Sequence, residues 1–332
     1  MKAFIKDVEV YLPEQIITNE DLCRRNPNWD ASKIMSKVGI SQRHVAKDGE
    51  SSFVLAYRAC KKLIDRNPQY KRDIDFVLYS TLNHEHFMML SSALLQHRLN
   101  LSNSCGTMDL RLPCTGYIQL LSIAKALIVS RMAKNVLVVT ADTYSKRISP
   151  KDVGTLSIFG DAATATIIST DGWGCLGSIS LGSDGIGTEN HIARIMCIPD
   201  SYPDELTMQN DPSLTVFSPD NFYMVGSEIF NFVTDKIPVF YKLFLSNNNL
   251  SVDDINLHIF HQANKYMLTY LKKRLAIPDD KFYINMSDIG NTSTSSLPIC
   301  LYRAYENKQL RGLASMCAYG GGYTWGGAIL EI

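Results

Sequence analysis

Cys114 has both the residue type and the position of a candidate nucleophile. It lies in the stretch Asp109–Tyr117, immediately before a long apolar pattern of helical type. This placement predicts a thiol at a helix N-terminus, where unpaired N–H groups and the helix dipole favour the thiolate. Thr115 and Gly116 are small enough to let an acyl group approach the sulfur. A cysteine at a helix start is more often structural, so Cys114 alone does not establish a nucleophile.

Three downstream motifs supply partners for such a nucleophile. They are His261–Asn264 after a strand pattern, the run Gly290–Ser293, and the glycine-rich segment Gly320–Gly327. Singly, each has an ordinary explanation: a core histidine, a turn, and a flexible loop. Together with Cys114 they provide a nucleophile, a His, an Asn and an oxyanion loop, which indicates a site for acyl chemistry.

Composition excludes several other classes of function. The 332 residues include 33 Lys+Arg and 33 Asp+Glu, so the formal net charge is zero and a charge-driven nucleic-acid or membrane partner is not expected. The N-terminal residues lack an uninterrupted apolar segment of the signal-peptide type. No apolar run approaches the roughly 18 residues of a transmembrane helix. The eight cysteines form no CxxC pair, which favours reduced thiols and a cytoplasmic location.

Strand patterns alternate with helical patterns along the whole chain, which predicts an α/β fold. The strands are expected at 4–11, 75–80, 135–140, 162–168, 258–260, 314–319 and 327–332, and the helices from 19, at 51–64, 115–132, 221–247 and 264–275. Two similar small-residue turns, Phe159–Ala165 and Gly321–Ala328, each lead into a strand. This echo predicts two related halves, 1–170 with the cysteine and 171–332 with the histidine and asparagine. Residues 184–215 form an irregular segment.

The chain resembles a known family, the β-ketoacyl-ACP (3-oxoacyl-ACP) synthases III of the thiolase superfamily. The resemblance extends from end to end and rests on six motifs: Gly39-Ile40 with Arg43-His44, Cys114-Thr115-Gly116, Phe159-Gly160-Asp161, His261-Gln262-Ala263-Asn264, Gly290-Asn291-Thr292-Ser293 and Gly320–Gly326. It implies a thiolase-like fold, in which two βαβαβαββ halves form a five-layer α-β-α-β-α core. It also implies a homodimer.

The resemblance implies a decarboxylative Claisen condensation. Cys114 would hold the acyl group taken from acyl-CoA or acyl-ACP, with the N–H groups of Cys114 and Gly321 as the oxyanion hole. His261 and Asn291 would hold the thioester oxygen of malonyl-ACP during its decarboxylation. The product would be a 3-oxoacyl thioester. Neither donor needs a charge, and no metal or redox cofactor is required.

The resemblance predicts the substrate-binding residues less directly than the catalytic ones. Asn264 and Phe87 are expected to contact substrate, with Phe87 in the acyl pocket or at a dimer contact. Lys272, Lys273 and Arg274 suit docking of an acidic acyl carrier protein, although a solvated helix face explains them equally well. Housekeeping members of the family clamp the adenine of coenzyme A between a Trp and an Arg. Lys33 and Val153 occupy those positions here, and Trp29 is four residues too early.

Other readings remain open. The segment 109–161 resembles members that act in secondary metabolism or on surface-glycan acyl groups. The same fold also supports transfer of the acyl group from Cys114 to a hydroxyl or amine, but an intact Asn291 favours condensation. A non-catalytic partner subunit is a third reading, against which the intact Cys114 argues. Acyl chain length and branching are not determined by the sequence.

Overall fold

A single ten-stranded sheet runs through the computed structural model, which describes residues 1–85, 88–189, 193–194 and 221–332. Its strand order is β12-β11-β13-β14-β8-β1-β7-β6-β4-β5. The strands are β1 (Phe4–Tyr11), β4 (Phe76–Ser80), β5 (Gly106–Leu110), β6 (Asn135–Asp142), β7 (Ala162–Ser169), β8 (Gly174–Ser183), β11 (Leu257–Phe260), β12 (Phe282–Tyr283), β13 (Leu313–Gly320) and β14 (Thr324–Glu331).

The sheet consists of two five-stranded sets with one topology. The sets are β1-β7-β6-β4-β5 and β8-β14-β13-β11-β12. When the strands of each set are numbered in chain order, both sets have the spatial order first, fifth, fourth, second, third. In both sets the fifth strand pairs antiparallel with the first and with the fourth. The second strand pairs parallel with the fourth and with the third. The sets meet where β1 pairs with β8 at Phe4–Cys175 and Ile5–Gly174. We interpret the repeat as two copies of a βαβαβαββ unit; the boundary at residue 170 stays a prediction.

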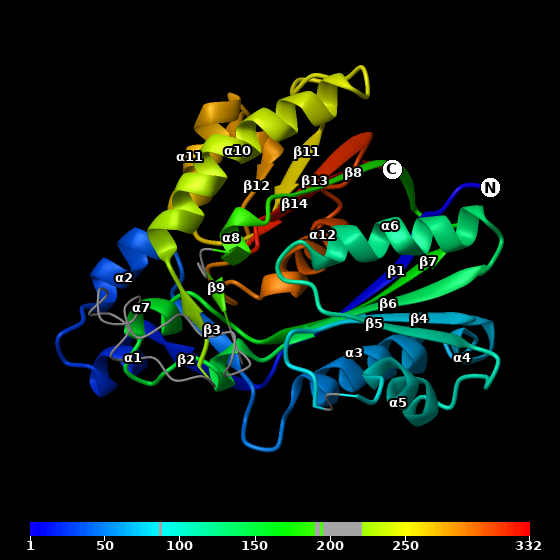
Figure 1. Cartoon of the computed structure of the whole chain (residues 1–332), viewed down its shortest axis with the longest axis horizontal. Coiled ribbons are helices and arrows are strands. Elements are labelled where there is room, and N and C mark those ends of the chain that lie inside the picture. The colour runs from blue at the N-terminus through cyan, green and yellow to red at the C-terminus, as the bar shows by residue number, and fades with distance from the viewer. Residues whose placement is uncertain (86–87, 190–192, 195–220) are drawn as a thin grey trace.

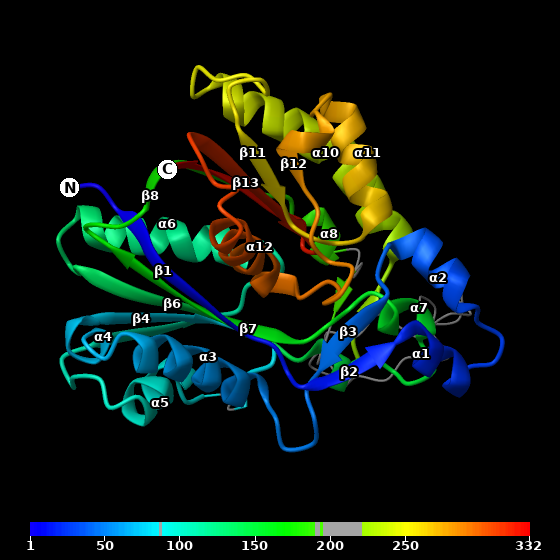
Figure 2. The same ribbon diagram turned by 180° about the vertical axis from the view of Figure 1, so that it is seen from behind.

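Six of the described helices complete the layers (Figures 1 and 2). They are α3 (Ser52–Arg66), α5 (Ser91–Arg98), α6 (Gly116–Val129), α10 (Gly226–Ser246), α11 (Lys265–Leu275) and α12 (Ser296–Glu306). Helices α6 and α12 share one buried cluster with strands of both sets. Helices α3 and α5 pack against the outer face of the first set, and α10 and α11 against that of the second. The expected five-layer α-β-α-β-α arrangement is therefore present.

Burial from two sides explains the composition of α6. Tyr117, Ile118, Leu120, Leu121 and Ala124 are fully buried and lie on one broad apolar face of the helix. A helix with so wide a buried face suits an inner layer. Its first residues therefore lie deep in the protein, between the two sets of strands.

Shorter elements form excursions from the two sets. The first excursion contains β2 (Gln15–Thr18), α1 (Asn19–Arg25), α2 (Ala31–Val38) and β3 (Gln42–Val45). The remaining short elements are α4 (Tyr70–Asp73), η1 (Tyr144–Lys146), α7 (Val153–Leu156), α8 (Ile186–Glu189), β9 (Ala193–Arg194), β10 (Tyr223–Met224), η4 (Asp279–Lys281) and η5 (Ser293–Ser295). Thr18 begins α1 with a capping box to Asp21. None of the described helices is both long and apolar enough to cross a membrane.

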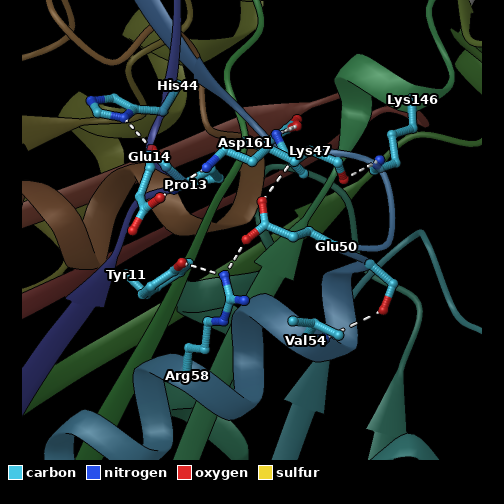
Figure 3. Close-up of polar contacts among 12 residues, drawn as sticks. Tyr11, Pro13, Glu14, His44, Lys47, Glu50, Val54, Arg58, Lys146 and Asp161 are labelled. Carbon is cyan, nitrogen blue, oxygen red and sulfur yellow. Dashed lines mark hydrogen bonds and ion pairs between the residues drawn. The ribbon is translucent and has the colours of Figure 1, made fainter.

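A buried carboxylate attaches the first excursion to the sheet. Asp161 accepts hydrogen bonds from the backbone N–H of Ala46 at 2.8 Å and of Ser145 at 3.0 Å. Lys146 adds a bond from its Nζ to the carbonyl oxygen of Lys47 at 2.7 Å, close to Asp161 in Figure 3. These bonds hold the segment after β6 in place, and that segment contributes to the site.

The structure corrects two of the expected elements. The glycine-rich segment is not an eight-residue loop, because Thr324 to Gly327 already pair with β13 and β8 and only residues 321–323 form the turn. The helix expected from 221 begins at Gly226, because Tyr223 and Met224 pair with β9. Strands β5, β8 and β12 and helices α5 and α12 were not expected from the sequence.

Candidate active site

The candidate catalytic residues converge on one cavity of about 180 Å³. Cys114 reaches it from the first set of strands, while His261, Asn291 and Gly321 reach it from the second. Asn264 also lines it. The site is therefore built at the junction of the two halves, from motifs that are up to 207 residues apart in the chain (321 − 114).

Cys114 lies between β5 and α6, at the inner helix layer. A Cβ atom on Gly320 would lie 3.1 Å from the Cβ of Cys114 and 3.5 Å from its Sγ, so a side chain there would crowd Cys114. Burial raises the pKa of the Cys114 thiol to about 12. Burial therefore opposes the thiolate that the position before α6 favours, and the thiolate stays a prediction.

His261 follows β11 and is 1% exposed. Its Nδ1 lies 2.7 Å from Ser296 Oγ, and its carbonyl oxygen accepts a bond from the Tyr319 hydroxyl at 3.2 Å. Burial lowers the pKa of His261 to about 3. The imidazole is therefore neutral at physiological pH. In the tautomer with hydrogen on Nε2, Nδ1 accepts from Ser296 and Nε2 remains a donor.

Asn291 is held by backbone contacts with the other half. Its N–H donates to Ile158 O at 2.8 Å, and its carbonyl oxygen accepts from Gly160 N at 3.0 Å, forming a short parallel bridge at Phe159. A Cβ on Gly160 would lie 2.0 Å from the Ile289 carbonyl oxygen, so this approach requires glycine. The Asn291 Oδ1 accepts from Ser293 N at 2.9 Å, which leaves its Nδ2 amide as the donor for a ligand.

The predicted substrate-binding residues separate into different places. Asn264 caps α11, with its Oδ1 accepting from Met267 N at 2.8 Å, and it lines the cavity. Lys272, Lys273 and Arg274 are at the opposite end of α11, roughly 12 Å further along the helix axis. They are not part of the cavity, so their docking role stays a prediction. Phe87 lies outside the described residues.

Aromatic residues form a wall of the cavity that sequence reasoning missed. The rings of Tyr144 and Phe159 stack with centroids 4.9 Å apart, and Phe222 meets Phe159 edge-on at 5.3 Å. All three line the cavity. The Phe-Gly-Asp motif was a signal for Phe159, but nothing in the sequence placed Phe222 beside it.

The two positions of the family's adenine clamp also differ in their surroundings. Val153 is buried, whereas Lys33 is exposed. Trp29 is 43% exposed, and its Cη2 would lie 3.8 Å from a Cβ on Gly154. An aromatic ring is therefore present beside α7, although it comes from an earlier position in the chain.

A duplicated five-layer α/β fold with a cysteine, a histidine and an asparagine around one inner cavity defines an enzyme of the thiolase type. Comparison with known proteins narrows this class. The model of 3-oxoacyl-[acyl-carrier-protein (ACP)] synthase III matches residues 108–185, and the model of its C-terminal part matches residues 245–332.

Curated relatives match over the whole length. A β-ketoacyl-[acyl-carrier-protein] synthase III of Campylobacter jejuni is 32% identical over 335 residues, which span 100% of this chain and 98% of the relative. That of Campylobacter fetus is 34% identical, with 99% and 98% covered. A crystal structure of a 3-oxoacyl-(acyl-carrier-protein) synthase III superposes with a TM-score of 0.92 at 33% identity, covering 100% of both chains. The chain belongs to the 3-oxoacyl-ACP synthase III family.

Proposed function

We propose that the protein catalyses decarboxylative Claisen condensation of a Cys114-bound acyl group with malonyl-ACP. The observation that carries this proposal is the convergence of Cys114, neutral His261 and the Asn291 amide on one cavity. A nucleophile that carries an acyl group and two neutral donors that polarise one carbonyl are what the two half-reactions need.

The first half-reaction loads the enzyme. The Cys114 sulfur attacks the carbonyl carbon of an acyl thioester, and the thiol of the donor leaves. The N–H groups of Cys114 and Gly321 stabilise the negative oxygen of the tetrahedral intermediate. The product of this step is an acyl-enzyme and a free coenzyme A or carrier-protein thiol.

The second half-reaction forms the carbon–carbon bond. His261 Nε2–H and Asn291 Nδ2–H donate to the thioester oxygen of malonyl-ACP while its C–C bond to the carboxylate breaks and carbon dioxide leaves. The enolate carbon then attacks the acyl carbonyl of Cys114, and the sulfur leaves as the thiolate. A neutral histidine suits this role, because the hydrogen on Nε2 is donated but not transferred. No metal or redox cofactor enters either step.

The proposed partners are an acyl carrier protein and a second copy of the chain. Strand β5 is the outer strand of its set, with β4 as its neighbour on one side. Exposed apolar side chains lie on it and before the adjoining helix α5: Met108, Met88, Met89 and Leu90. An open strand edge with an apolar surround suits pairing between copies. Light scattering of Met108→Lys should show a monomer if β5 forms the interface, and an unchanged dimer would exclude that edge.

Mass spectrometry tests the proposed reaction directly. The protein is incubated with acyl thioesters, with and without malonyl-ACP, and acyl-enzyme, 3-oxoacyl product and carbon dioxide are measured. Acylation followed by formation of both the 3-oxoacyl product and carbon dioxide supports the proposal. Acylation without carbon dioxide release would favour transfer to a hydroxyl or amine, and no acylation would favour a partner subunit. The cytoplasmic location and the specialised pathway stay predictions.

A further inference from the structure

The two proposed oxyanion donors come from separate parts of the chain. The N–H of Cys114 lies just before α6, and the N–H of Gly321 lies in the turn between β13 and β14. Neither N–H donates to another residue in the part of the chain that the structure describes, so both are free for a ligand. One oxygen can use both donors only if the turn and the start of the helix are held at a fixed spacing.

Bonds on the outer side of the turn join it to the second set of strands. Tyr323 and Asp184 exchange two backbone hydrogen bonds, of 2.7 and 2.9 Å. Thr188 Oγ1 donates to the carbonyl oxygen of Gly322 at 2.6 Å. These residues all follow β8, the first strand of the second set, so their contacts do not fix the turn relative to Cys114.

A pair of threonine hydroxyls joins the turn to the start of α6. Thr115 follows Cys114 directly, Thr324 is the first residue of β14, and their Oγ1 atoms lie 2.9 Å apart. Gly320 is opposite Thr324 in the β13–β14 ladder, and a Cβ on it would lie 3.5 Å from the Cys114 nitrogen. The hydroxyl bond therefore connects the residue beside one donor to the end of the turn that carries the other.

Thr115 makes this bond in place of a helix cap. It is the N-cap residue of α6, where a threonine side chain usually accepts from an N–H of the first turn, but its side chain makes no such bond. Its Oγ1 instead accepts from Gln119 Nε2 at 2.9 Å. Because an amide N–H can only donate, the hydrogen of the Thr115 hydroxyl is free for Thr324. Thr115 is fully buried, so its hydroxyl depends on these two partners.

We propose that Thr115 and Thr324 are positioning residues for the oxyanion hole. Their hydroxyl bond sets the spacing between the N–H groups of Cys114 and Gly321, and thereby stabilises the tetrahedral intermediate that forms when Cys114 is acylated. The inference rests on the proposed function, which makes these N–H groups the oxyanion donors. Neither threonine is among the described residues that line the cavity, so both act through the two donors.

Isosteric variants separate the hydroxyl from the shape of the side chain. Thr324→Val removes the hydroxyl and keeps a β-branched side chain in β14, whereas Thr324→Ser keeps the hydroxyl. Thr115→Val breaks the same bond from the other end. Thr166→Val is a matched control, because Thr166 is a buried hydroxyl that bonds Tyr117 of α6 at 3.3 Å but lies on β7, in the first set of strands.

Two reactions of Cys114 distinguish a defect in the oxyanion hole from a defect in the thiol. Acylation by a thioester forms a tetrahedral oxyanion, whereas alkylation by iodoacetamide displaces iodide in one step and forms none. Mass spectrometry of the Cys114 peptide follows both reactions in single-turnover experiments. Thr324→Val should be acylated about 10- to 100-fold more slowly at saturating thioester, with an unchanged half-saturating concentration and an unchanged alkylation rate. Thr324→Ser and Thr166→Val should match the wild type in both reactions.

Loss of the bond from either end should have the same effect. Thr115→Val should slow acylation as much as Thr324→Val, and the double variant should be no slower than either single variant, because both changes remove one shared bond. If one valine variant does not fold, the other decides the question by comparison with Thr324→Ser and Thr166→Val.

Acylation of the valine variants at the wild-type rate would overturn the positioning role and leave the condensation proposal intact. An equal fall in acylation and alkylation would also overturn it, since the defect would then lie in the thiol. A wild-type protein that is alkylated at Cys114 but acylated by no thioester would overturn the proposed function, and the positioning role with it.

Discussion

The two halves share one strand order and differ in what connects the strands. In the first half, β6 and β7 are joined by residues 143–161, which include η1 and α7. In the second half, the equivalent strands β13 and β14 are joined by the three residues 321–323. The long connection supplies aromatic cavity wall through Tyr144 and Phe159, and the short one supplies Gly321 beside the nucleophile. The two halves thus share a strand order but differ in the loops between strands. Cys114 lies in one half, and the hydrogen-bond donors His261 and Asn291 lie in the other.

Burial acts in opposite directions on the ionisable groups of the two halves. It raises the pKa of Cys114 to about 12 and lowers that of His261 to about 3. Burial thus favours the neutral form of both groups. In the proposed reaction the first half carries the cysteine and the second half carries the donors for decarboxylation, and variants can test that division.

The largest effect is expected at the nucleophile. Cys114→Ser should abolish acyl-enzyme formation, because a hydroxyl lacks the nucleophilicity of the thiolate. Intact-mass analysis after incubation with an acyl thioester measures this, with Cys175→Ser as a control from the second half. Acylation of another cysteine in the Cys114 variant would show that the nucleophile is misassigned.

Loss of a hydrogen-bond donor in the second half should give the next largest effect. His261→Ala and Asn291→Ala should keep Cys114 loading but lower malonyl decarboxylation by about 100- to 1000-fold, as expected for loss of one oxyanion donor. Carbon dioxide release from the acylated enzyme measures it, and the exposed His97→Ala serves as a control. An equal loss of both half-reactions in Asn291→Ala would contradict the division between the halves.

A smaller effect concerns the choice of acyl donor. Lys33 and buried Val153 provide no stacking surface, so we expect coenzyme A to load Cys114 about ten- to a hundredfold less efficiently than carrier protein. Loading rate against concentration, for one acyl group on each carrier, measures this. Comparable efficiency from coenzyme A would refute it. If Trp29→Ala then lost that efficiency and Met35→Ala did not, Trp29 would be the stacking residue.

The smallest effect is a change in stability with pH. An unfolded histidine binds a proton below about pH 6.5, whereas folded His261 does so only near 3. Its contribution to stability is therefore present above 6.5 and is lost as the pH falls. Relative to His261→Gln, the wild type should lose about 2 kcal/mol between pH 7 and 5. Denaturant unfolding at both values measures it, and a constant difference would show that His261 is accessible to protons.

The sequence predicted the frame and the three residues that converge on the cavity because both depend on local patterns. Cys114, His261 and Asn291 each follow a recognisable strand or turn signal, and α6 has a broad apolar face. Strand β12 was missed because it is only two residues long, Phe282–Tyr283. The burial of Cys114 was also missed, since it depends on segments distant in the chain.

The bridge between Phe159 and Asn291 has a consequence for how substrate range can change. Its hydrogen bonds join backbone atoms only, so the Phe159 ring takes no part in holding Asn291. Replacing that ring by a smaller or larger one alters the room for the acyl chain and leaves the amide donor where it is. The cavity lining can in this way change through the Phe159 side chain, while main-chain atoms of its neighbours Ile158 and Gly160 keep Asn291 in place.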